Sequence, residues 1–226
     1  MSWLPRRQRR DEPSARTEPP FDPTSWHGAL AVMLGVGALL WILQLINATN
    51  DYSLNRAAGL RPREASGLWG VFASPFLHHS YYHLFSNTVP LVLIGWVLLL
   101  SGVRAWLTVT AIVVVIGGLA SWVLAPEGLI VGASALVLGW LGYLLSRAYF
   151  SRSVRWIVVA VLVLFFFGTL LGTLLPGLGH GESWIVHACY FAAGILAGAM
   201  LHPRTRRQRG ALARPSDPGA AAPPVS

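Results

Sequence analysis

Four polar side chains lie within long apolar blocks of the sequence: His83, Asn87, Ser134 and His187. A serine hydroxyl is a weak nucleophile until a positioned base accepts its proton, and an imidazole is a common base for that task. Ser134 stands at the predicted start of a helix, where unpaired N–H groups and the helix dipole favour a developing oxyanion. These residues therefore predict serine catalysis with His187 as the base.

No carboxylate accompanies these residues in the apolar blocks. All nine acids fall in predicted tails or loops: Asp11, Glu12, Glu18, Asp22, Asp51, Glu64, Glu127, Glu182 and Asp217. An aspartyl intramembrane protease needs two buried carboxylates, and a zinc protease needs a motif such as His-Glu-x-x-His, whereas the sequence has no His-Glu dipeptide. We therefore expect a Ser–His dyad that uses no metal or other cofactor, with its imidazole held by packing instead of by an acid.

The composition favours lipid as the solvent of this chain. The sequence has 226 residues, of which 54% are hydrophobic and 12% are charged. Its apolar residues form uninterrupted blocks without the polar faces at period 3.6 or 2 that a soluble fold would show. The net charge of +8 rests on arginines in tails and between blocks, a pattern typical of membrane orientation. We expect an integral, multi-pass protein of a bacterial plasma membrane, with the lipid bilayer and no nucleic acid as partner.

Six apolar blocks are each close to the roughly 20 residues that a membrane helix needs. They cover residues 28–46, 83–100, 106–124, 131–149, 154–175 and 184–201. We predict an all-α membrane protein in which six transmembrane helices form one bundle over residues 27–202. Residues 1–26 and 203–226 are rich in arginine and proline, and they are predicted to be disordered tails.

Arginine placement predicts the orientation. Fourteen of the seventeen basic residues lie in the tails, in the junction of blocks 2 and 3, or around that of blocks 4 and 5. Both termini should therefore be cytoplasmic. The other three share the outer loop between blocks 1 and 2, about residues 50–82, which also carries an apolar stretch over residues 68–72. We expect this loop to lie partly in the membrane interface; an ordinary solvated loop is the alternative.

The four polar residues share one depth in this arrangement. The even-numbered helices run from outside to inside, and each polar residue lies in the first turn or two of its helix. At 1.5 Å per residue, all four fall about 5 to 10 Å below the outer boundary. His83 and Asn87 are four residues apart, so they lie on one helix face and can point at a common target.

Taken together, these residues resemble the rhomboid family of intramembrane serine proteases, over the whole six-helix core. The family's His-x-x-x-Asn motif matches residues 83–87, which follow a histidine-rich run over residues 76–80. Its Gly-x-Ser motif matches residues 132–134, and its sixth-helix histidine matches His187, which precedes small residues.

The resemblance implies a role for each matched residue. Ser134 would be the nucleophile, and His187 the base and then the acid. His83 and Asn87 would stabilise the oxyanion together with the Ser134 backbone N–H. The substrate would be a transmembrane segment of another protein, cut near the outer face. The oligomeric state is left open.

Further residues are candidates for supporting the site, and three positions depart from the family pattern. His78, Gly132 and Tyr190 are the candidate supports. Ala135, Leu138 and Tyr190 stand where the family has glycine, tyrosine and glycine. We hypothesise that the ring of Tyr190 fills the space that Leu138 leaves beside the histidine. The alternative is a crowded, weakened or substrate-restricted site.

Two other functions stay open from the residues alone. A rhomboid-like protein with weak or no catalysis could bind membrane-protein clients, which the three departures allow. A small transporter would place polar groups near the bilayer midplane, whereas these residues lie in the outer third.

Overall fold

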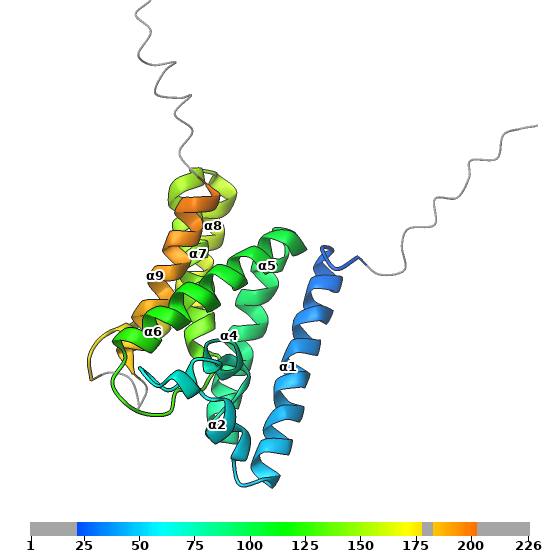
Figure 1. Cartoon of the computed structure of the whole chain (residues 1–226). Coiled ribbons are helices and arrows are strands. Elements are labelled where there is room, and N and C mark those ends of the chain that lie inside the picture. The colour runs from blue at the N-terminus through cyan, green and yellow to red at the C-terminus, as the bar shows by residue number, and fades with distance from the viewer. Residues whose placement is uncertain (1–21, 178–182, 203–226) are drawn as a thin grey trace, which may run out of the picture.

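The computed structural model describes residues 22–177 and 183–202, and the secondary structure of this part is helical apart from one isolated bridge between Leu60 and Ile130 (Figure 1). The predicted tails, apart from residues 22–26, and the predicted loop around Glu182 lie outside the described residues. The helices, in chain order, are α1 (Trp26–Thr49), α2 (Ser53–Ala58), η1 (Ala65–Gly67), α3 (Gly70–Ala73), η2 (Ser74–Phe76), α4 (Tyr81–Leu99), α5 (Val103–Ile112), η3 (Val113–Gly117), α6 (Gly118–Leu124), α7 (Ser134–Ser151), α8 (Val154–Phe167), η4 (Gly168–Leu174) and α9 (Trp184–Leu201).

Five helical segments of the described chain are long and apolar enough to cross a membrane. They are α1, α4, the run α5–η3–α6, the run α8–η4, and α9. Much of their apolar surface faces outward, and Phe165 of α8 is 80% exposed. Apolar surface on this scale needs lipid or a partner to cover it. The chain is therefore an all-helical, multi-pass membrane protein, as predicted, although α7 is not among the five segments.

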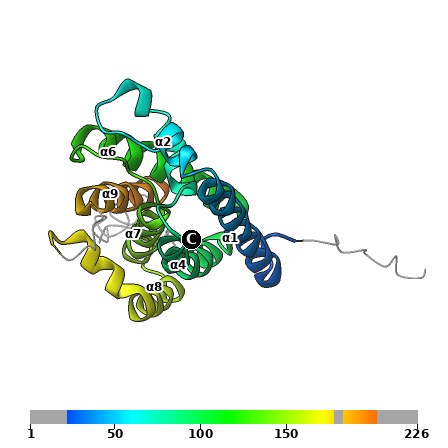
Figure 2. The ribbon, with the colours of Figure 1, turned by 90° about the horizontal axis from the view of Figure 1, so that it is seen from below.

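Helix α7 lies at the centre of the bundle, between α4, α8 and α9 (Figure 2). Twelve of its eighteen residues are buried, so its environment is protein more than lipid. It approaches α9 closely, because a Cβ atom at Gly194 would overlap the carbonyl oxygen of Gly139. The apolar block starts at Val131, and the helix begins at Ser134, after a turn at Gly132, so the predicted place of Ser134 at a helix start is confirmed.

The third apolar segment is not one regular helix, although the sequence predicts a single helix over residues 106–124. Residues Val113–Gly117 form a π-helix, η3, between α5 and α6. A π-helix accommodates an extra residue in the turn and is frequent at functional sites. The extra residue shifts which side chains lie on a given face of the helix. The face of α6 that packs on α9 is therefore not a regular continuation of a face of α5.

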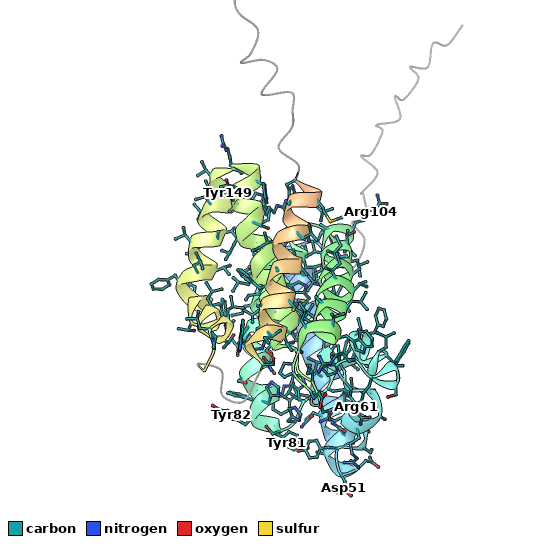
Figure 3. All side chains as sticks on the ribbon, turned by 60° about the vertical axis from the view of Figure 1, so that its left-hand side comes forward. Asp51, Arg61, Tyr81, Tyr82, Arg104 and Tyr149 are labelled. Carbon is teal, nitrogen blue, oxygen red and sulfur yellow. The ribbon has the colours of Figure 1, made fainter. Side chains whose placement is uncertain are left out.

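The two ends of the bundle carry different connections. Arg104 and Tyr149 lie at one end, and Asp51, Arg61, Tyr81 and Tyr82 lie at the other (Figure 3). The first residues of α1 and the last residues of α9 lie at the same end of the bundle as the start of α5 (Figure 1), the helix that carries Arg104 (Figure 3). This grouping agrees with the arginine pattern. The assignment of that end to the cytoplasm stays a prediction.

The long connection between α1 and α4 folds into the short helices α2, η1, α3 and η2 (Figure 1). It is tied to the end of α6, because Arg63 donates to the carbonyl of Ala125 at 2.6 Å and Trp122 donates to the carbonyl of Glu64 at 2.9 Å. Trp69 in this connection is 68% exposed. An exposed tryptophan suits a position at a lipid–water interface, which stays our prediction for this segment.

Candidate active site

The predicted nucleophile and base meet between α7 and α9. Ser134 is the first residue of α7, and its Oγ lies 3.0 Å from Nε2 of His187 in the first turn of α9. The other ring nitrogen, Nδ1, lies 3.4 Å from the carbonyl oxygen of Thr173. With the proton on Nδ1, facing that carbonyl, Nε2 presents its lone pair to the serine hydroxyl. His187 is 3% exposed, so neighbouring helices hold its ring.

Gly132 shapes the turn that presents Ser134. Its φ of +130° is a conformation that residues with a side chain rarely adopt. A Cβ atom there would lie 2.7 Å from Cε1 of His83 and 3.7 Å from the Ser134 hydroxyl oxygen. The next residue, Ala133, supplies no side-chain cap, which leaves the first N–H groups of α7 to other acceptors. Glycine is therefore needed here for backbone conformation and for space.

His83 and Asn87 come to the same place from α4, as predicted. Ser80 caps this helix by accepting a hydrogen bond from the His83 N–H at 3.1 Å, which puts His83 in the first turn. The Asn87 side chain donates one hydrogen bond to the His83 carbonyl at 3.0 Å. An amide has two N–H groups, so one remains to serve a ligand. The ring of His83 packs edge-on against His78 and is stacked on His79.

Two cavities open on either side of the Ser134–His187 pair. One of about 410 Å³ is bounded by the chain from Pro126 to Gly132 and by the start of α9. The other, of about 430 Å³, is bounded by α4, by Leu138 of α7 and by η4. Ser134, His187 and His83 line both cavities. A peptide segment could therefore pass through the site with its reacting bond at the serine.

A buried chain of hydrogen bonds supports the turn before Ser134, and sequence reasoning missed two of its members. Asn47 of α1 donates to the Asn55 side chain at 2.7 Å, and Asn55 donates to the His78 carbonyl at 3.0 Å. His78, which is fully buried, accepts a hydrogen bond from the Ala133 N–H at 3.3 Å. The predicted support by His78 thus acts on the backbone next to Ser134. The signal that could have found this chain was Asn47 at the end of an apolar block.

Tyr190 lies elsewhere than our hypothesis requires. Its ring packs against Gly117 and Gly118, where η3 meets α6. Leu138 instead lines the larger cavity beside the Ser134–His187 pair. The space for Tyr190 comes from two glycines of another helix, so the structure does not support compensation between Leu138 and Tyr190. Ala135, the third departure, lines the smaller cavity.

Comparison with known proteins gives one family and several bacterial relatives. Residues 65–204 match the Rhomboid domain. A protein of Mycobacterium tuberculosis is 34% identical over 227 residues, covering 92% of this chain and 94% of the relative. A Mycobacterium leprae protein is 33% identical over 192 residues, covering 81% of this chain and 76% of the relative. Both relatives are described as uncharacterized proteins.

Proposed function

The chain belongs to the rhomboid family, and from this premise we propose that it is an intramembrane serine endopeptidase with a Ser134–His187 dyad. The observation that carries the proposal is the 3.0 Å contact between Ser134 Oγ and His187 Nε2 at the junction of two cavities. A serine bonded to a histidine base and open to a ligand has the geometry that acyl transfer requires.

The proposed reaction proceeds in two stages. Ser134 Oγ attacks the carbonyl carbon of the scissile bond while His187 Nε2 takes the hydroxyl proton. His83, Asn87 and the Ser134 N–H donate hydrogen bonds to the oxyanion. The carbon–nitrogen bond breaks as His187 returns the proton to the leaving amine, which leaves an ester on Ser134. Water, deprotonated by His187, then hydrolyses this ester and regenerates the serine.

The proposed substrates are transmembrane segments of other membrane proteins, cut near the outer face. Support comes from the position of Ser134 and His187, each in the first turn of its helix, toward the end of the bundle that the arginines mark as outer. In this proposal α7 also spans the membrane, in addition to the five candidate segments, so that six helices span it. Both termini lie in the cytoplasm of a bacterial cell. Because its neighbours cover it, α7 does not need the uniformly apolar surface of a lipid-facing helix.

A second candidate is a family member that binds membrane-protein clients with little or no cleavage. The departures at Ala135 and Leu138 favour it, because both residues line the cavities beside Ser134 and so change the volume that a substrate meets. The two candidates differ in whether the hydroxyl of Ser134 is needed.

The deciding experiment compares wild type, Ser134→Ala and Ser146→Ala in liposomes with a panel of single-span substrates. Ser146 is on the same helix but donates to the Tyr143 carbonyl, so it serves as the matched control. We expect wild type and Ser146→Ala to cleave substrate and to react with a fluorophosphonate, and Ser134→Ala to do neither. Equal cleavage by Ser134→Ala, or an active wild type that the reagent does not label, would contradict the mechanism.

A further inference from the structure

Tyr190 occupies a slot built by three separate helical segments. It is 2% exposed and lies three residues after His187 in α9. A Cβ atom at Gly117 would lie 2.8 Å from Tyr190 Cγ, and one at Gly118 would lie 3.2 Å from its hydroxyl oxygen. On α7, a Cβ atom at Gly139 would lie 3.1 Å from the Tyr190 carbonyl oxygen. Gly117, Gly118 and Gly139 therefore form the slot because they lack side chains: the ring and backbone of Tyr190 occupy the space that a side chain at these positions would need.

The π-helix η3 is what brings the two glycines to Tyr190. Gly117 is the last residue of η3, and Gly118 is the first residue of α6. Val113, at the other end of η3, packs directly against Gly139 of α7. One irregular turn thus contacts both of the helices that carry the Ser134–His187 pair. A π-turn is less favourable than a regular helical turn, so its presence indicates that this contact has a role.

A series of contacts connects the hydroxyl of Tyr190 to the turn before Ser134. It interacts with the side chain of Ser74 in η2, and both residues are buried. The carbonyl of Ser74 accepts a hydrogen bond from the Gly132 N–H at 2.9 Å. Gly132 is two residues before Ser134 and lies against His83. The order of contacts is therefore Tyr190, Ser74, Gly132 and then the turn that carries Ser134.

We propose that Tyr190 is a positioning residue for the Ser134–His187 pair. It is on the helix of His187, and through Ser74 it holds the turn of Ser134, so it sets the position of the nucleophile relative to the base. The ring fixes α9 against η3, and the hydroxyl fixes η2. This inference rests on the proposed function. It assigns a role to a residue that does not contact the Ser134 hydroxyl and does not line the two cavities beside Ser134.

The test removes the two hydroxyls separately and together. Tyr190→Phe keeps the ring in its slot, and Ser74→Ala removes the other partner. We expect each change to lower kcat about tenfold at unchanged KM, and to slow fluorophosphonate labelling similarly, because small displacements of reacting groups are costly. The double variant should lose no more than either single variant, since both act through one contact. Tyr143→Phe, which removes a buried phenol hydroxyl in the interior of α7, away from Ser134, is the matched control.

A second measurement follows the contact itself. Amide hydrogen exchange over residues 130–134 should be faster in Tyr190→Phe and in Ser74→Ala than in wild type or Tyr143→Phe. Unchanged exchange, additive losses in the double variant, or wild-type kcat in Tyr190→Phe would each overturn the inference. An inactive wild type would count against the proposed function alone, because the exchange measurement judges the Tyr190–Ser74–Gly132 connection without substrate.

Discussion

Two hydroxyl–histidine contacts connect α7 with the chain at the two ends of α9. At one end Ser134 Oγ lies 3.0 Å from His187 Nε2, and at the other end the Tyr143 hydroxyl lies 3.1 Å from His202 Nε2. Both hydroxyls are on α7, and the two pairs use the same ring nitrogen at nearly the same distance. Only the first pair has the surroundings of an active site.

The surroundings differ in charge and in access. Ser134 begins a helix, beside the positive end of its dipole, and lines two cavities. Tyr143 is in the interior of α7 and accepts a hydrogen bond from Arg147, whose guanidinium lies 3.6 Å from the centre of the Trp156 ring. Stacked and hydrogen-bonded in this way, the second cluster joins α7, α8 and α9. The comparison teaches that a hydroxyl–histidine contact becomes a candidate catalytic pair through its access and oxyanion donors.

The largest expected effect separates the two histidines. His187→Gln should lower kcat by roughly 10⁴- to 10⁶-fold, since members of a catalytic pair act as a unit. His202→Gln should leave kcat within about twofold of wild type, because it is remote from the reacting atoms. Both rates are measured in liposomes with one transmembrane substrate. Similar losses in the two variants would break the comparison.

A smaller effect separates two glycines with positive φ. Gly132→Ala should lower activity on the order of 100-fold, because its Cβ would displace the His83 ring beside the nucleophile. Gly102, with φ +108°, has nothing within 4 Å of an added Cβ, and it is the residue before α5, at the end where Arg104 lies. Gly102→Ala should therefore cost about 1–3 kcal/mol of stability through its backbone alone and keep its activity. Activity and thermal unfolding of both variants provide the measurement.

The smallest expected effect is a pH dependence at the second contact. His202 follows α9, and burial, followed by the charge of Arg147, lowers its pKa below the ordinary 6.5. The unfolded chain then binds more protons than the folded one between the two pKa values, so this contribution to stability is present above pH 6.5. It is lost as the pH falls through the lowered pKa. Thermal unfolding in detergent should show a slightly steeper loss on acidification for wild type than for His202→Gln. Parallel curves would show that His202 makes no such contribution.

The sequence carries much of the site, because polar residues are conspicuous against an apolar background. Ser134, His187, His83 and Asn87 could be found in this way, and they do converge in the structure. Asn47 could have been noticed at the end of its apolar block, but its bond to Asn55 and the bond from Asn55 to His78 could not, because those pairings depend on the tertiary fold.

Other features could not be predicted from the sequence because they do not change its pattern of hydropathy. A π-turn over Val113–Gly117 has the same apolar composition as a regular turn, so one extra residue per turn is invisible in the sequence. The place where the Tyr190 ring packs escaped prediction for a related reason. The spacing of Tyr190 from His187 along α9 does not predict that its ring packs against Gly117 and Gly118 of another helical segment. The protein environment of α7 is likewise a property of its neighbours.

The contact between Gly194 and Gly139 has a mechanical consequence. It joins α7 to α9 backbone to backbone, with no flexible side chain and no acyl chain between them. A change in bilayer thickness acts first on the helices with the most lipid-facing surface, such as α8, which respond by tilting. We therefore expect the spacing of Ser134 and His187 to change less with bilayer thickness than the tilt of α8 does.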